Sequence, residues 1–196
     1  MFWQEDDKKD DVSTSDKVVD VSYKIDCKQI PTSHATALAA ALYKALPWLK
    51  DEPGAAIQQI HGATSGNGWE RPADGEWIHL SRRTRMQLRL PVERVEAAQA
   101  LCGMTLDIAG VSLTVGEMST KPINPLATIF SRYIVVPDGQ SEDAFLQWVA
   151  ESLAQLGVPV KKLLCGMGHT IEVNGENLET RSLMIADLDK ASSVLI

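Results

Sequence analysis

Two segments of the chain alternate between apolar and polar side chains with a period of two. In residues 17–27 one face carries the apolar side chains Val19, Val21, Tyr23, Ile25 and Cys27. In residues 85–90 they are Met86, Leu88 and Leu90. Successive side chains of a β-strand point to opposite faces, so each segment predicts a strand with one buried and one polar face.

The second of these strands concentrates arginine in an acidic chain. The formal net charge is −7, yet residues 80–91 contain Arg82, Arg83, Arg85 and Arg89. The guanidinium group is a planar fork of donors that fits phosphate oxygens, so this cationic strand face favours a polyanion as partner. The alternative is a solvated face whose arginines pair with acidic side chains elsewhere.

The rest of the first half predicts helices and further strands. Pro31, Thr32 and Ser33 provide a cap before a helix whose Leu38, Leu42 and Leu46 recur every four residues. The expected order is strand, helix, strand, strand, helix, strand, over residues 17–27, 34–46, 55–61, 76–91, 92–102 and 107–118, where the last segment is either a strand or a hairpin. A glycine-rich loop, residues 62–68, joins the third and fourth of these elements.

The second half begins the same order again. The expected elements are a strand over 126–136, a helix over 141–156, two strands joined by the turn Asn174-Gly175, and a helix that Asp189 caps and that reaches Ile196. This order predicts an α+β fold of two tandem ferredoxin-like, RRM-like domains, each a split βαβ unit. The expected boundaries are an acidic mobile tail at 1–16 and domains at 17–122 and 123–196, the second lacking its last strand.

Several classes of protein are disfavoured by what the sequence contains. Phe2 and Trp3 are followed by acidic residues and not by an apolar run, which argues against a signal peptide or a membrane span and favours the cytoplasm. Cys27, Cys102 and Cys165 are isolated and odd in number, so we expect small core residues and no disulfide framework. No His-x-x-x-His pair, P-loop or Gly-x-Ser-x-Gly elbow occurs, and we therefore expect no metal and no cofactor.

The four histidines differ in their setting. His34 stands at the start of a helix, where free backbone amides attract anions, and a neutral imidazole beside a phosphate can take a proton from a hydroxyl group. The alternative for His34 is a surface side chain without a role. For His61 and His79 a hydrogen-bonded structural role is favoured. His169 follows Lys161 and Lys162 and could either contact a ligand or be structural.

Short blocks in a single order connect these features to a known family. They cover the chain from about residue 17 to its end and are Pro31-Thr32-Ser33-His34, Pro47-Trp48-Leu49, Ile60-His61-Gly62-Ala63, Ser65-Gly66-Asn67-Gly68-Trp69, Leu80-Ser81-Arg82-Arg83-Thr84-Arg85, Leu113-Thr114-Val115-Gly116, Lys162-Leu163-Leu164-Cys165-Gly166 and Thr180-Arg181-Ser182-Leu183-Met184. With these blocks the chain resembles the CRISPR-associated repeat-processing endoribonucleases, specifically the shorter Myxococcus-type branch. That family has paired ferredoxin-like domains.

The resemblance implies metal-independent cleavage of CRISPR repeat RNA, which releases mature guide RNA. The ribose 2′-hydroxyl attacks its own phosphate and leaves a cyclic phosphate and a 5′-hydroxyl. His34 matches the family's histidine at the start of its first helix and becomes the candidate general base or acid. Candidate contacts to the RNA are Arg82, Arg83, Arg85 and Arg89, with Lys161, Lys162 and His169 as weaker ones. Family members end in a glycine-rich loop and a last strand, and this chain reaches Ile196 before either.

Two other functions stay open. One is a non-catalytic RNA-binding subunit that acts with other CRISPR effector subunits, which predicts repeat binding without a cyclic-phosphate product. The other is a small-ligand or protein-interaction module of the same architecture, in which the arginines pair with acidic residues. Binding of RNA through several arginines weakens steeply with salt, and this separates the RNA-binding functions from the third.

Overall fold

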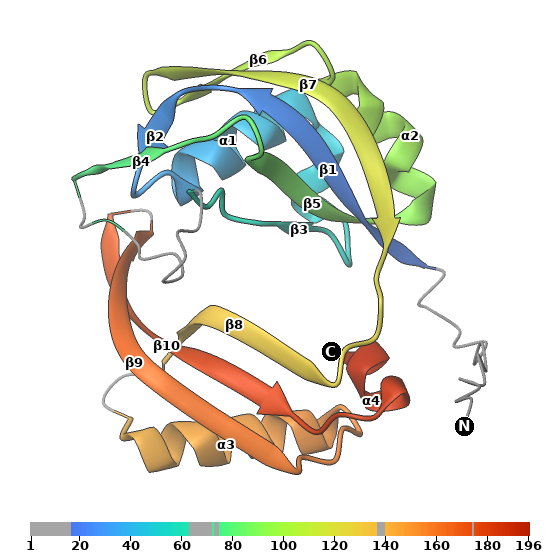
Figure 1. Cartoon of the computed structure of the whole chain (residues 1–196), viewed down its shortest axis with the longest axis vertical. Coiled ribbons are helices and arrows are strands. Elements are labelled where there is room, and N and C mark those ends of the chain that lie inside the picture. Colours follow the sequence, from blue (N-terminus) through green and yellow to red (C-terminus); the bar gives the residue numbers. More distant parts are fainter. Residues whose placement is uncertain (1–16, 63–71, 73–74, 137–139, 174) are drawn as a thin grey trace, which may run out of the picture.

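The computed structural model describes residues 17–62, 72, 75–136, 140–173 and 175–196 (Figure 1). The predicted acidic tail, most of the glycine-rich loop and Asn174 lie outside the described residues. Two groups of strands and helices follow one another along the chain, one before and one after the linker at residues 123–127.

The first group is built on a five-stranded antiparallel sheet in the order β3-β5-β1-β7-β6. Its strands are β1 (Val18–Asp26), β3 (Ala56–Ile57), β5 (Arg85–Pro91), β6 (Thr105–Ile108) and β7 (Val111–Pro122). Its helices are α1 (Ala35–Ala45), the 3-10 helix Pro47–Asp51, and α2 (Val95–Ala98) between 3-10 turns at Val92–Arg94 and Gln99–Leu101. Without the edge strand β6, the strands and helices follow the ferredoxin-like order.

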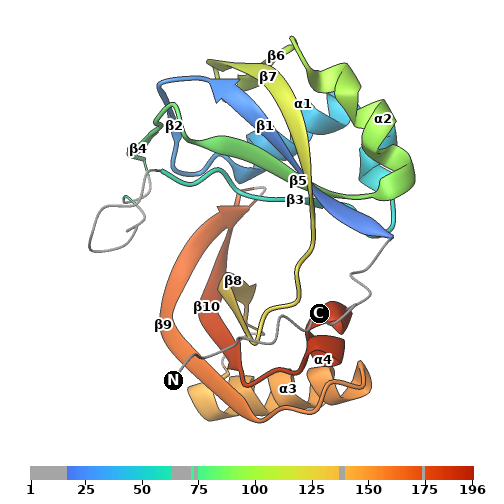
Figure 2. The same cartoon turned by 45° about the vertical axis from the view of Figure 1, so that its right-hand side comes forward.

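The core of this domain lies between the sheet and its helices. Met86, Leu88 and Leu90 of β5 are fully buried, as are Val21 and Tyr23 of β1, and they pack with apolar residues of α1 and of the helical segment 92–101. The alternation in residues 85–90 is therefore confirmed, whereas in β1 Ser22, expected on the polar face, is also buried. The helices lie on one side of the sheet in both views (Figure 1, Figure 2).

Three expectations for local structure are wrong. Residues 76–91 are not one strand, because β4 (Trp77–His79) pairs with β2 (Gln29–Pro31) in a separate two-stranded sheet and a turn at 81–84 precedes β5. No side chain caps α1 at its start; Thr32 Oγ1 donates instead to the carbonyl of Glu76, at 2.9 Å. Cys102 is exposed and not a core residue.

The second group forms a three-stranded antiparallel sheet in the order β8-β10-β9. Its elements are β8 (Thr128–Val135), α3 (Glu142–Gln155), β9 (Lys162–Val173), β10 (Glu176–Ala186) and α4 (Lys190–Leu195). The predicted hairpin is confirmed by the pairing of Val173 with Glu176 and by the positive φ of Gly175. Within the described residues no strand pairs with the free edge of β8, so this sheet has three of the four ferredoxin-like strands.

The arrangement of the two sheets leaves one face of the second sheet turned toward the first domain. Helix α3 covers the opposite face, with Phe145, Val149 and Leu153 buried against β10 and its neighbours (Figure 1, Figure 2). Short helix α4 follows β10, and Asp189 Oδ1 accepts the Ser192 amide at 2.7 Å, which confirms the predicted cap. Among the described residues, no helix combines the length and apolar character that a membrane span needs.

Candidate functional site

The polar face of β5 carries the arginines that the sequence singles out. Arg85, Gln87 and Arg89 are half-buried and alternate with the fully buried Met86 and Leu88. Because the buried residues face the helices, the arginines lie on the side of the sheet that the helices leave uncovered. The strand therefore places two cationic groups, Arg85 and Arg89, on one face with the neutral Gln87 between them.

Arg89 is engaged by an acidic neighbour. Its Nε and Nη2 lie 2.9 and 3.3 Å from the two carboxylate oxygens of Asp20, which stands directly across from it on β1. This bidentate ion pair is what the alternative interpretation of the arginines predicts, in which they pair with acidic side chains of the same protein. Contact of Arg89 with a phosphate would have to compete with Asp20.

Arg82 and Arg83 lie in a compact turn before β5. The Thr84 amide donates to the Ser81 carbonyl at 2.9 Å, and the Ser81 amide donates to Thr84 Oγ1 at 3.0 Å. Arg85 Nη1 donates to the carbonyls of Arg82 and Thr84 at 2.9 and 2.8 Å, which holds this guanidinium over the turn. Both Arg82 and Arg83 are exposed, so the turn presents cationic side chains to solvent.

Beside this turn the surface forms a pocket of about 430 Å³. It is lined almost wholly by polar and cationic residues, namely Gln59, His61, Gly62, Ser81, Arg83, Thr84, Arg85 and Gln87. Two arginines, a histidine and two amide side chains thus share one concave site. Such a set offers donors to phosphate oxygens and an imidazole for proton transfer.

His34 is not the surface side chain that the sequence suggests. It precedes α1 as its N-cap residue and is only 1% exposed. Nδ1 lies 2.9 Å from the carbonyl oxygen of Pro31, and Nε2 accepts the backbone amide of Ile60 at 3.1 Å. The ring is buried because it connects two segments of backbone that the sequence separates by 29 residues.

His61 is the histidine in the polar pocket, and the sequence analysis did not assign it a chemical role. It is exposed, whereas its neighbour Ile60 is 1% exposed and belongs to the core. Gln59 and His61 flank this apolar residue, and an alternation of this kind predicts that both point away from the core. The sequence alone could therefore have identified His61 as a surface histidine.

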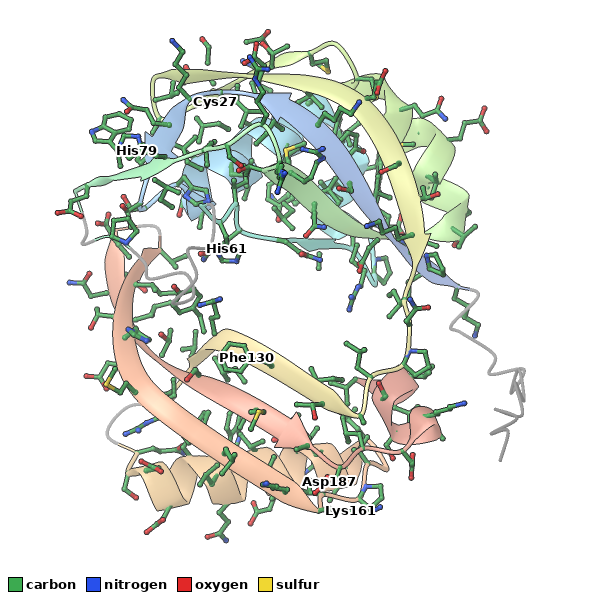
Figure 3. All side chains as sticks on the ribbon, viewed as in Figure 1. Cys27, His61, His79, Phe130, Lys161 and Asp187 are labelled. Carbon is green, nitrogen blue, oxygen red and sulfur yellow. The ribbon has the colours of Figure 1, made fainter. Side chains whose placement is uncertain are left out.

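The weaker candidates lie in the second domain and are separated from one another. His169 lies in β9, with its ring 6.1 Å from that of Tyr133 in an edge-to-face arrangement. Lys161 and Lys162 stand at the start of the same strand, seven or eight residues earlier, which corresponds to roughly 25 Å of extended chain. Figure 3 shows Lys161 beside Asp187, on the side of the second domain away from His61.

The open face of the second sheet carries an apolar row that the sequence analysis did not predict. Met184 pairs with Phe130 on one side and Leu164 on the other. Phe130 is 56% exposed and Leu164 45%, and the guanidinium of Arg132 lies 5.8 Å from the centre of the Phe130 ring. Figure 3 shows Phe130 on the side of this sheet that is turned toward the first domain.

No set of three or more His, Cys, Asp and Glu side chains that could hold a metal ion occurs in the described part of the chain. The donors of the polar pocket are arginines, amides, hydroxyls and one imidazole. The chemistry that these residues can carry out is therefore charge stabilisation and proton transfer.

Comparison with known proteins first defines the class. A solved structure of a CRISPR-associated protein Cas6 superposes with a TM-score of 0.57 at 12% identity and covers 91% of each chain. The fold is thus that of proteins with tandem ferredoxin-like domains, as the sequence predicts. Residues 19–196 match the sequence model of the Cas6 Crispr family, and the chain belongs to that family.

Two further proteins are similar to this chain, one compared by sequence and one by structure. The CRISPR-associated endonuclease Cas6 of Myxococcus xanthus (strain DK1622) is 26% identical over 178 residues, which are 91% of this chain and 73% of the relative. A structure of Thermus thermophilus Cse3 bound to an RNA representing a pre-cleavage complex has a TM-score of 0.44 and 10% identity, over 91% of this chain and 89% of that one.

Proposed function

We propose that this Cas6 family member is an endoribonuclease that binds CRISPR repeat RNA and cleaves it to release guide RNA. The observation that supports this most directly is the pocket that gathers Arg83, Arg85 and His61 at one edge of the first domain. Family membership over residues 19–196 and the endonuclease name of the Myxococcus xanthus relative support the choice of reaction. A substrate of this kind places the protein in the cytoplasm.

The proposed reaction needs no metal ion. The 2′-hydroxyl of the nucleotide before the cut gives up its proton and attacks the adjacent phosphorus, and the bond to the 5′ oxygen breaks. Cations near the phosphate stabilise the charge that builds on its oxygens. Arg83 and Arg85 are suited to this because both residues line the same pocket and carry guanidinium groups.

The RNA backbone is expected to follow the exposed arginines. Arg82 and Arg83 on the turn and Arg85 on β5 are the first contacts we propose, since phosphate contacts position a nucleic acid. Arg89 contributes only where the RNA displaces Asp20. Lys161, Lys162 and His169 are secondary contacts, because they lie on a different domain from the pocket.

The sequence assigns proton transfer to His34. A general base needs an unoccupied lone pair, and the lone pair of Nε2 is directed at the Ile60 amide. His34 can act as base only if RNA binding breaks that hydrogen bond. Replacing His34 with Ala is expected to abolish cleavage with RNA affinity nearly unchanged; full cleavage by this variant would rule out any essential role.

The experiment that tests the function is incubation of the protein with end-labelled repeat RNA in excess chelator. We expect one product that ends in a cyclic phosphate and one that begins with a 5′-hydroxyl, and no product when the nucleotide before the cut is 2′-deoxy. Cleavage that requires a divalent metal, or that tolerates the 2′-deoxy substitution, would contradict the proposed chemistry.

A second candidate function is a non-catalytic RNA-binding subunit that acts with other CRISPR effector subunits. The engagement of both His34 ring nitrogens by backbone groups favours it. It predicts salt-dependent repeat binding with no cyclic-phosphate product. If the protein is instead a module that recognises a protein or a small ligand, we expect no binding of repeat RNA. The ion pair between Arg89 and Asp20 is consistent with that function.

A further inference from the structure

The hydrogen bonds of His34 define its protonation state. A backbone carbonyl can only accept and a backbone amide can only donate, so Nδ1 carries the proton shared with Pro31 and Nε2 carries none. The ring is the neutral Nδ1–H tautomer and is almost fully buried. In this arrangement both ring nitrogens of His34 face backbone groups.

The hydrogen bond between His34 and Ile60 also fixes the backbone directly before His61. Ile60 is held twice, by its amide on His34 and by its buried side chain in the core. A little earlier, the amide of Gln58 donates to the carbonyl of Gln87 at 3.1 Å, which extends the pairing of β3 with β5. These anchors act on the residues directly before His61, so they determine where its backbone lies.

His61 has the surroundings that a proton-transfer group for this reaction needs. It is exposed, and it lines the pocket together with Arg83 and Arg85. Figure 3 shows it on the side of the first domain that is turned toward the second domain. An RNA phosphate held by the arginines would bring a ribose hydroxyl within reach of the imidazole.

We propose that His61 is the catalytic histidine that contacts the RNA, and that His34 is a positioning residue that acts through the Ile60 amide. This inference rests on the proposed endoribonuclease function. A neutral ring nitrogen of His61 takes the proton of the 2′-hydroxyl as the bond from O2′ to phosphorus forms and the bond from phosphorus to O5′ breaks. The departing O5′ takes a proton from water, and the resulting hydroxide takes the proton back from the His61 imidazolium.

The two roles predict opposite results for the same substitution at the two positions. Glutamine can accept the Ile60 amide through its side-chain oxygen, but it cannot accept and release a proton near neutral pH. We expect His34→Gln to cleave repeat RNA within about tenfold of the unchanged protein, and His61→Gln to lose about 100-fold or more. The matched control is His79→Gln, at an exposed histidine of β4, for which we expect an unchanged rate.

Chemical rescue and RNA-binding measurements distinguish a role in proton transfer from a structural role for each histidine. Added imidazole is expected to restore part of the cleavage activity of His61→Ala, because the pocket is open to solvent. It is expected to restore no activity to His34→Ala, because the site of the His34 ring is buried. Circular dichroism and thermal unfolding report whether each variant is folded. Affinity for a 2′-deoxy repeat is expected to change less than about threefold in His61→Gln.

The outcomes distinguish this inference from the function on which it rests. Failure of the unchanged protein to cleave repeat RNA would overturn both. Normal cleavage by His61→Gln, or a loss that only follows its loss of RNA affinity, would overturn the role of His61 and leave the endoribonuclease in place. Cleavage by His61→Gln combined with a complete loss in His34→Gln would assign proton transfer to His34.

Discussion

The second domain repeats the strand and helix order of the first as far as its third ferredoxin-like strand and the helix after it, but the uncovered sheet faces of the two domains differ in chemistry. In the first domain, β5 presents Arg85, Gln87 and Arg89 beside a pocket with His61. In the second domain, the corresponding face presents the apolar row of Phe130, Met184 and Leu164. One backbone arrangement thus supports two kinds of surface, because alternate residues of a strand can change without effect on the buried face.

The domains also differ in the size of their cores. Among the described residues, the cluster of the first domain contains 18 buried apolar residues and that of the second contains eight. Since stabilisation by burial scales with the apolar area removed from water, the second domain has less reserve against the loss of one side chain. The predictions below use these two contrasts, from the largest expected effect to the smallest.

The largest effect is expected for Phe145→Ala in the second domain. Phe145 is a fully buried residue of α3 that packs against the sheet, and removal of such a side chain costs about 3–5 kcal/mol. We expect β10 to lose protection in native-state hydrogen exchange while β5 keeps it. For the matched variant in the first domain, Leu88→Ala, we expect β5 to lose protection while β10 keeps it. Equal loss of protection in both domains in either variant would show that they unfold as one unit.

RNA affinity is expected to depend on the first domain more than on the second. Arg83→Ala should weaken repeat binding about tenfold at moderate salt and lower the slope of log Kd against log salt by about 0.7–0.9, as expected for one lost phosphate contact. Lys161→Ala and Lys162→Ala should each cause a smaller change, because these residues lie at the far end of β9. Fluorescence anisotropy at several salt concentrations measures both quantities; a larger effect of the lysines would reverse the assignment.

A pH-dependent effect is expected at the core of the first domain. The Tyr23 hydroxyl donates to the Ala98 carbonyl at 3.0 Å, and burial raises the pKa of Tyr23 well above its usual range. The unfolded chain releases this proton near pH 10 and the folded chain keeps it, so stability falls as pH rises above 10. Tyr23→Phe should cost about 1 kcal/mol at pH 7 and should flatten this alkaline loss in urea unfolding measured from pH 7 to 11.

The smallest effect is expected at the helix that follows β10. The hydrogen bond from the Ser192 amide holds the pKa of Asp189 below its usual range. The carboxylate therefore contributes stability above the ordinary aspartate pKa near 3.9, and that contribution is lost as the pH falls through the lowered value. Asp189→Asn, which keeps an acceptor but no charge, should remove this dependence with little change at pH 7. Urea unfolding between pH 2 and 5 checks it.

Local patterns predicted most of the elements and the chemistry of their faces. The alternation in residues 85–90, the turn at Gly175 and the cap at Asp189 each depend on neighbours close in the chain, and the structure confirms them. Burial of His34 was not predictable in this way, because its two partners belong to separate segments that meet only in the folded domain. The ion pair of Arg89 likewise depends on the register that places Asp20 opposite it.

The sequence by itself determined the ferredoxin-like order of the main strands and helices, the buried face of β5 and the presence of several arginines on that strand and its preceding turn. These properties follow from side-chain period and turn chemistry, which act over a few residues. Only the tertiary structure decided which histidine is enclosed by backbone groups and which one lines a pocket with arginines. That choice depends on hydrogen bonds between residues far apart in the chain, and such bonds exist only when strands and helices have packed into one core.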